Sequence, residues 1–216
     1  MSLKLYDYEA SANCYKVRLL LAQLSLRYER IPIDIFAGDT LTPEFRQKNP
    51  SRSTPVLEIG DGTYLTESNA ILFYLAEDTP FLPAGRLDRA DVVRWLIVEQ
   101  QEVMTMVGGL RFRLVTGRWK PDDPDAIRRR RGAEGALALL DEHLSTRDFL
   151  VSGRYTIADI ANYAYSHVAG EAGLDLGRYP AIERWHRRVE GTPLFMNDLV
   201  PYPANSRAGA GTSIYS

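Results

Sequence analysis

The chain of 216 residues carries 26 Lys and Arg against 28 Asp and Glu, and 45% of its residues are hydrophobic. At about 150 residues per domain, this length fits one large domain or two small ones, each able to bury a core. A formal net charge of −2 provides no broad positive field for phosphate backbones or anionic lipid. We therefore expect neither nucleic acid nor a membrane surface among the partners.

The single cysteine, Cys14, excludes an internal disulfide, and three scattered histidines offer no metal-ligand spacing. We therefore expect no metal and a reducing compartment. No apolar run approaches the roughly 20 residues that span a bilayer, and the first residues lack an apolar signal core. These observations together predict a soluble, cytoplasmic protein.

The first 80 residues alternate strand-like and helix-like patterns. The predicted elements are a strand at 3–5, a helix through 17–24, an extended segment at 28–33, a helical turn at 43–46, strands at 56–59 and 64–66, and a helix at 68–76. Gly60 and Gly62 lie between the two later strands and predict a hairpin, since glycine supplies the positive φ of tight turns. The pattern predicts an α/β domain over residues 1–78.

Two prolines and a glycine in residues 78–87 indicate a linker, which we place at 79–88. Residues 89–216 predict an all-α helical bundle domain. Its expected helices are at 89–116, with a bend near Gly108 and Gly109, at 126–144 and at 181–191, where Pro193 ends the last one. Small residues dominate the chain from about 201, which predicts a flexible tail.

The clearest folding signal of this half is the segment from Tyr155 to Ile160. Thr156 is placed as an N-cap and Asp159 as the residue that returns the hydrogen bond, while Tyr155 and Ile160 can form a hydrophobic staple. We interpret this capping box as structural and not catalytic.

Four consecutive arginines, 128–131, resemble a site for nucleic acid. On a helix four consecutive positions point all around the axis. Acidic residues flank the run, namely Asp122, Asp123, Asp125 and Glu134. A solvated face with salt bridges is therefore the expected structure.

Three clusters in the first domain carry residues suited to chemistry, at 11–17, 49–57 and 67–72. Ser11 and Asn13 precede a helix, where they either cap it or help to stabilise an anion such as a thiolate. Pro55 enters a strand, either in a cis turn or as an ordinary transition from the loop. Ser68 either caps the next helix or holds a carboxylate with the helix amides.

Four ordered motifs resemble the cytosolic glutathione transferases, of a theta-like or nu-like type. They are the Ser11 to Val17 segment, Asn-Pro-x-x-x-x-Pro-Val-Leu from Asn49, Glu-Ser-x-Ala-Ile-Leu from Glu67, and the Thr-Ile-Ala-Asp capping box. The resemblance covers nearly the whole chain. It implies an α/β thioredoxin-like N-terminal domain, an all-α C-terminal helical bundle domain, glutathione as co-substrate and a homodimer.

The resemblance also implies roles for single residues. Thr54 matches the residue whose backbone pairs with the cysteinyl part of glutathione, and Pro55 matches the cis-proline. Glu67 and Ser68 match the pair that holds the γ-glutamyl end. Arg52 lies where relatives place a basic residue for the glycyl carboxylate, although the neighbouring residues depart from the usual pattern.

The residue that activates the thiol differs between classes of the family. Ser11 matches the serine of theta-like classes and Asn13 the asparagine of the nu-like group, so we assign them as principal donor and partner. Tyr6 lies near the catalytic tyrosine of other classes and is the second choice. Cys14 would suggest a mixed-disulfide mechanism, but a lone cysteine on a helix is usually buried and inert.

The resemblance implies the addition of the glutathione thiolate to a small hydrophobic electrophile. The electrophile is expected between the two domains, against six side chains: Tyr6, Tyr8, Met104, Leu110, Arg111 and Phe112. Two alternatives stay open. One is a glutathione-dependent disulfide or peroxide reductase without a catalytic protein cysteine, and the other is a glutathione-binding or interaction module with little catalysis.

Overall fold

The computed structural model describes residues 2–60 and 62–215, and the chain divides into two compact units. The first unit joins Met1–Leu75 to Met196–Ser216, and the second is Ala76–Phe195. None of the helices found in the described residues is long and apolar enough to cross a membrane.

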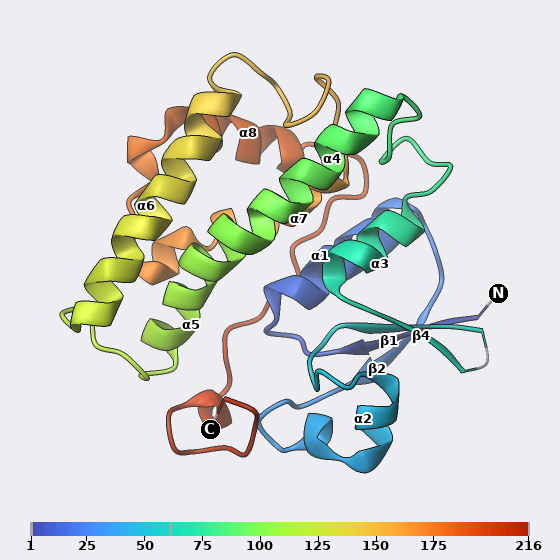
Figure 1. The fold of residues 1–216 in the computed structure, drawn as a ribbon, viewed down its shortest axis with the longest axis vertical. Helices are drawn as coiled ribbons and strands as arrows, with labels where there is room; N and C mark the ends of the chain where they lie inside the picture. The colour runs from blue at the N-terminus through green and yellow to red at the C-terminus, as the bar shows by residue number, and fades with distance from the viewer. Residues whose placement is uncertain (1, 61, 216) are drawn as a thin grey trace. The chain divides into compact units, whose positions relative to one another are not determined.

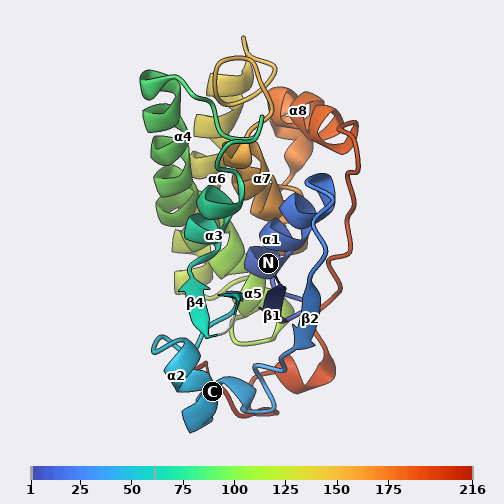
Figure 2. The ribbon, with the colours of Figure 1, turned by 90° about the vertical axis from the view of Figure 1, so that its right-hand side faces the viewer.

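The first unit is built on a sheet of four strands in the order β2-β1-β3-β4 (Figure 1). Its elements are β1 Leu3–Asp7, α1 Ala12–Gln23, β2 Glu29–Pro32, the 3-10 turn η1 Asp39–Leu41, α2 Pro43–Lys48, β3 Val56–Ile59, β4 Thr63–Thr66 and α3 Ser68–Leu75. Strand β1 runs parallel to β2 and antiparallel to β3. Figures 1 and 2 show α1 and α3 side by side on one face of the sheet. This is the predicted α/β thioredoxin-like arrangement.

The predicted hairpin of β3 and β4 is confirmed. The two strands are antiparallel, with Ile59 opposite Thr63. Gly60 and Gly62 have φ values of 65° and 92°, a backbone region that is strained for other residues. The predicted turn also includes Asp61, which lies outside the described residues.

A buried ion network fixes α1 to the end of β1. Arg18 Nη1 lies 2.6 Å from Asp7 Oδ1, and both side chains are fully buried. Arg18 Nε donates to both carboxylate oxygens of Asp198 at 2.9 Å. A buried guanidinium needs such partners, because an unpaired charge away from water is strongly destabilising. Residues far apart in the chain are therefore tied together at one point.

The C-terminal tail, Met196–Ser216, differs from its prediction. We expected the chain from about 201 to be a flexible part of the helical domain, but these residues pack with the first unit. The backbone N–H of Thr212 donates to the Phe36 carbonyl at 2.8 Å, and Asn205 Nδ2 donates to Asp34 Oδ2 at 2.7 Å. Composition predicted flexibility because it registers small residues and not the hydrogen bonds they make with distant backbone.

Gly211 shows why small residues suit this tail. A Cβ atom at this position would lie 2.5 Å from the Asn205 carbonyl oxygen and 2.7 Å from that of Phe36. Only glycine allows the two stretches of backbone to approach so closely. The small residues that suggested flexibility therefore allow the tail to pack closely against neighbouring backbone.

The second unit is all helical (Figure 2). Its elements are α4 Arg86–Val98, the π-helical segment η2 Glu99–Gly108, α5 Gly109–Val115, α6 Pro124–Leu144, α7 Ile157–Ser166, the 3-10 turns η3 Ala169–Ala172 and η4 Leu176–Arg178, and α8 Pro180–Glu190. A further 3-10 turn, η5 Ala204–Ser206, belongs to the tail. Helix α4 begins inside the segment expected as a linker, because Gly85 is extended and its carbonyl accepts from the Arg89 N–H at 2.9 Å.

Glycines let the central helical segments pack closely. The change from π to α geometry falls at Gly108 and Gly109, where the sequence predicted a bend. A Cβ on Gly108 would lie 2.5 Å from the Tyr165 ring, and one on Gly132 would lie 2.8 Å from Met106 Sδ. Gly108 therefore lets η2 pack against α7, and Gly132 lets α6 pack against η2.

The predicted capping box at the start of α7 is confirmed. The Thr156 N–H donates to Asp159 Oδ2 at 2.9 Å, and the Ala158 N–H donates to Thr156 Oγ1 at 3.2 Å. Asp159 Oδ1 also accepts from the Leu150 N–H at 3.0 Å and from Trp185 Nε1 at 2.9 Å. One buried carboxylate thus anchors three segments of the helical unit.

Candidate functional site

The start of α1 presents Ser11 and Asn13. Ser11 is the N-cap, with an extended backbone at φ −84° and ψ 119°, and its hydroxyl accepts from the Cys14 N–H at 3.3 Å. The capping interpretation of Ser11 is therefore correct. Both Ser11 and Asn13 are half-buried, so water or a ligand can reach them. The unpaired N–H groups and the dipole of this helix end favour an anion.

The loop before β3 forms a second part of the site. The prediction of a cis peptide bond is confirmed at Thr54–Pro55. Asn49 is 1% exposed and fixes the loop, because Nδ2 donates to the Ser53 carbonyl at 2.8 Å and Oδ1 accepts from the Ser51 N–H at 3.0 Å. Asn49 begins a sequence motif but had no predicted role, because only the structure shows that its side chain spans the loop.

The start of α3 completes the group. Helix α3 begins at Ser68, and the Glu67 carbonyl accepts from the Ile71 N–H at 2.9 Å, so Ser68 is the first helical residue and not the cap. Glu67 has a positive φ of 65°, and its side chain is exposed. Ser68 is 4% exposed, and its hydroxyl donates to Asn13 Oδ1 at 3.2 Å. This bond joins the starts of α1 and α3.

Cys14 lies where these segments meet, but its surroundings keep the thiol protonated. The side chain is fully buried, and burial is the main reason that its pKa rises to about 12, with the nearby Asp7 carboxylate adding to the effect. Hydrogen bonds with Thr54, Tyr8 and Ser11 oppose this rise only in part. A thiol in this state is a poor nucleophile, because the thiolate is the reactive form.

The same bonds locate the loop next to α1. Thr54 and Ser11 both reach the Cys14 side chain, and Tyr8 donates its N–H to Cys14 Sγ at 3.4 Å. The structure therefore brings together Ser11, Asn13, Thr54 and Ser68 from three segments of the first unit. It places Arg52 in the same loop, half-buried and with a φ of 55°.

Tyr6 and Tyr8 have different surroundings. The Tyr6 hydroxyl donates to Glu58 Oε2 at 2.8 Å, and burial together with this carboxylate raises its pKa. The Tyr8 ring lies 6.0 Å from that of Phe36 and 6.5 Å from that of Tyr202 in the tail. Its hydroxyl is buried without a hydrogen-bond partner in the described part of the chain, and burial raises its pKa.

The other four residues expected at an electrophile pocket belong to the helical unit. Leu110 is fully buried, and Arg111 is 1% exposed, with Nε 2.9 Å from Glu171 Oε2. Met104 and Phe112 are half-buried. Leu110 and Arg111 therefore belong to the core of the helical unit, whereas Met104 and Phe112 are partly exposed.

A metal site has no support among the side chains described. Over residues 2–60 and 62–215, no group of three or more His, Cys, Asp and Glu side chains is arranged to hold a metal ion. The candidate site consists instead of hydroxyl, amide and backbone groups at two helix starts and one cis-proline loop.

A thioredoxin-like sheet unit with this loop, followed by an all-helical unit, defines a known class of two-part glutathione-dependent proteins. Family models agree with that class: the glutathione S-transferase N-terminal domain matches residues 1–77, and the C-terminal domain matches residues 94–193. The chain belongs to the glutathione S-transferase family.

Individual relatives span nearly the whole chain. A solved structure of a possible glutathione S-transferase from Rhodopseudomonas palustris is 42% identical, covers 91% of this chain and 89% of its own, and has a TM-score of 0.86. A glutathione S-transferase from Pseudomonas fluorescens Pf-5 is 41% identical, with coverage of 92% and 99% and a TM-score of 0.88. The disulfide-bond oxidoreductase YfcG of Escherichia coli K12 is 30% identical over 84% of this chain and 87% of its own.

Proposed function

We propose that the protein is a glutathione transferase in which Ser11 stabilises the glutathione thiolate and Asn13 assists. The observation that carries this proposal is the meeting of α1, the cis-proline loop and α3, where Ser68 donates to Asn13 at 3.2 Å. Helix starts supply N–H donors for anions, and the half-buried Ser11 hydroxyl can turn toward a sulfur.

Each part of glutathione has an assigned contact in this proposal. The backbone of Thr54 pairs with the cysteinyl unit beside the cis Pro55. Glu67 and Ser68 hold the γ-glutamyl end at the start of α3, and Arg52 binds the glycyl carboxylate. A neighbouring structure from Pseudomonas fluorescens Pf-5, described with two glutathione molecules bound, supports glutathione as the partner.

The chemistry required is modest. A thiol with a pKa of about 8.5 is only about 3% ionised at pH 7, and lowering the pKa by two units requires about 2.7 kcal/mol. One or two hydrogen bonds and a helix N-terminus supply free energies of that order. The thiolate then adds to the electrophile, and the holding of both substrates in one site contributes proximity.

We assign the electrophile contacts to Met104 and Phe112, which keep accessible surface, ahead of the buried Leu110 and Arg111. Tyr8 ranks with the buried residues, because it is only 5% exposed. Tyr6 also ranks below Met104 and Phe112, since its hydroxyl already donates a hydrogen bond to Glu58 Oε2.

Replacing Ser11 tests the central assignment. We expect Ser11→Ala to lose conjugation of a model electrophile about 100-fold while glutathione affinity is kept, because the thiolate and not the peptide loses its donor. Ser11→Thr keeps a hydroxyl at the N-cap and serves as the matched control. Unchanged turnover in Ser11→Ala would remove Ser11 from the mechanism.

A disulfide reductase is the second candidate function. It is favoured by the name of the YfcG relative and by the buried Cys14 thiol, whose raised pKa suits a mechanism that uses only glutathione sulfur. Wild type and Cys14→Ala are compared on hydroxyethyl disulfide. Equal activity supports this function, and no activity in wild type excludes it.

A glutathione-binding module with little catalysis is the remaining alternative. Titration calorimetry with millimolar glutathione separates it, because binding without turnover on either substrate favours the module and no binding contradicts all three functions.

We also propose a cytoplasmic homodimer, by analogy with the family. A monomeric mass in sedimentation would refute the dimer.

A further inference from the structure

Two arginines of the 128–131 run, Arg129 and Arg130, are half-buried and depart from the expected solvated face. Arg128 pairs with Asp125, as expected for a surface helix, and Arg131 is exposed. Arg129 instead turns inward, where Nη1 donates to the Thr105 carbonyl of η2 at 2.6 Å. The close approach is possible because Gly109 has no side chain: a Cβ there would lie 2.9 Å from Arg129 Nη1.

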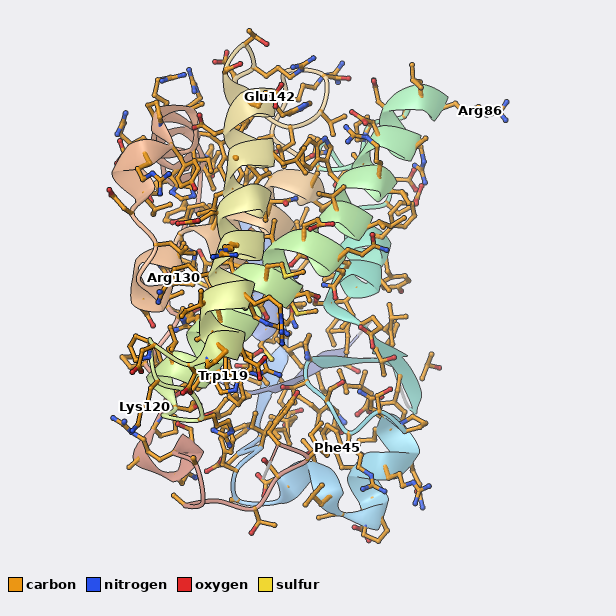
Figure 3. All side chains as sticks on the ribbon, turned by 60° about the vertical axis from the view of Figure 1, so that its left-hand side comes forward. Phe45, Arg86, Trp119, Lys120, Arg130 and Glu142 are labelled. Carbon is orange, nitrogen blue, oxygen red and sulfur yellow. The ribbon has the colours of Figure 1, made fainter. Side chains whose placement is uncertain are left out.

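A second guanidinium meets Arg129 at the ring of Trp119. Arg113 Cζ lies 4.8 Å from the ring centroid and Arg129 Cζ lies 5.6 Å from it. The turn after α5 puts Trp119 in place, because Gly117 has a φ of 73° and the Trp119 N–H donates to the Arg113 carbonyl at 3.0 Å. Figure 3 shows Trp119 and Lys120 near the start of α6.

The charges in this cluster are not balanced by carboxylates. Across residues 2–60 and 62–215, neither Arg113 nor Arg129 has a carboxylate within 4.0 Å, and each makes a single hydrogen bond, to a backbone carbonyl. The nearest acids have other roles or are exposed: Asp125 pairs with Arg128, Asp123 accepts from the Lys120 N–H, and Asp122 faces solvent. Burial and the neighbouring Arg113 and Arg128 lower the pKa of Arg129, and the charge of Asp125 opposes this only in part.

We propose that Arg113 and Arg129 form a binding site for a small oxyanion, such as a carboxylate or a sulfate, beside Trp119. Each guanidinium has five N–H donors in a planar fork that fits two oxygens of one anion, and only one donor is used here. Bound negative charge would also relieve the repulsion between the two cations. All residues of this site lie in the helical unit, so the proposal does not rest on the glutathione site.

Trp119 provides a local signal for the test. Trp95 and Trp185 are 1% and 0% exposed, whereas Trp119 is half-buried and lies within the site. Sodium sulfate and sodium benzoate are titrated into the full-length protein at constant ionic strength, with chloride as the balancing salt, and Trp emission is followed. A saturable change that chloride does not produce is expected, and it should disappear in Trp119→Phe. The two salts show which oxyanion geometry the site prefers.

Matched variants distinguish a specific anion site from a nonspecific effect of positive charge. We expect Arg113→Gln to weaken sulfate binding about tenfold, and Arg131→Gln, which removes the same charge from an exposed position, to leave it unchanged. Arg129→Gln should act like Arg113→Gln. If either variant fails to fold, Arg113→Lys and Arg129→Lys take its place; they keep the charge but lose the planar fork, and they should also weaken sulfate binding. No saturable response, an equal loss in Arg131→Gln, or a response caused by a second copy associating through this face would overturn it.

Discussion

The helix starts of α7 and α1 both have a hydroxyl N-cap, but they differ in burial and in how their backbone donors are satisfied. At α7, Thr156 is fully buried, and Asp159 returns the hydrogen bond to complete a capping box. At α1, Ser11 is half-buried, and its hydroxyl accepts from the Cys14 N–H at 3.3 Å. The third helical residue is Cys14, which has no carboxylate to return a hydrogen bond, and the Ser11 N–H donates instead to the Tyr8 carbonyl at 3.0 Å. A helix start that satisfies itself is structural, and one that leaves donors unused can serve a ligand.

The largest loss of stability is expected when the acid of the capping box is removed. Asp159→Ala leaves four buried donors without their acceptor: the N–H groups of Leu150, Thr156 and Trp185, and the Thr156 hydroxyl. We expect the free energy of unfolding to fall by about 3 kcal/mol or more, measured by urea denaturation. Glu44→Ala, which removes an exposed acid from the first turn of α2, is the control and should change stability by less than about 0.5 kcal/mol.

The far end of α7 adds a dependence on pH. His186 is buried against Ser166, with Nε2 2.9 Å from its Oγ, and burial lowers the pKa of this histidine to about 3. The unfolded chain therefore binds the proton more tightly, so the free energy of unfolding rises with pH from about 3 to about 6.5. We expect His186 to contribute a gain of roughly 2 to 3 kcal/mol across that window. Burial raises the pKa of Asp159 to about 6, and this carboxyl therefore opposes part of the gain as the pH rises toward 6. His186→Gln should have a flatter pH profile in urea denaturation, and an unchanged slope would contradict this origin.

Removing the two N-caps compares the helix starts directly. Thr156→Ala should lower the free energy of unfolding by about 1 to 2 kcal/mol, because a buried N–H loses its acceptor. Thr156→Ser keeps the hydroxyl and should recover most of this loss. A loss below about 0.5 kcal/mol would show that Asp159 alone carries the capping box.

The smallest expected change in stability is at α1. Ser11→Ala should lower the free energy of unfolding by less than about 1 kcal/mol, since water can reach the freed Cys14 N–H. Conjugation should nevertheless fall far more in this variant than in Thr156→Ala. Equal effects of the two substitutions on both stability and turnover would show that the two helix starts do not differ in role.

The fold was largely predictable because its signals are local. Alternation in β1, the glycines of the hairpin, and the Thr156 and Asp159 pair each act within a few residues, and all appear in the structure. The cis bond before Pro55 also appears as predicted. Local patterns also predicted an α/β unit followed by a helical one, and the family resemblance supplied the thioredoxin-like arrangement of the first unit.

The parts that escaped prediction depend on partners distant in sequence. Arg129 was grouped with its neighbours on a solvated face, but a carbonyl 24 residues earlier in the chain turns it inward. The tail was expected to be flexible, yet Phe36 and Asp34 hold it in place. Ser68 was expected to cap or to bind a carboxylate, and its bond to Asn13 spans 55 positions. No local sequence pattern indicates contacts between residues so far apart in the chain.

The bond between Arg18 and Asp198 has a consequence for the order in which the protein is completed during synthesis. A ribosome releases the whole helical unit, Ala76–Phe195, before Asp198 emerges, so the buried guanidinium in α1 waits for its second partner until then. The unit that is translated first is therefore finished last. A fragment ending near residue 78 would lack that carboxylate and should be less stable than the same unit within the whole chain.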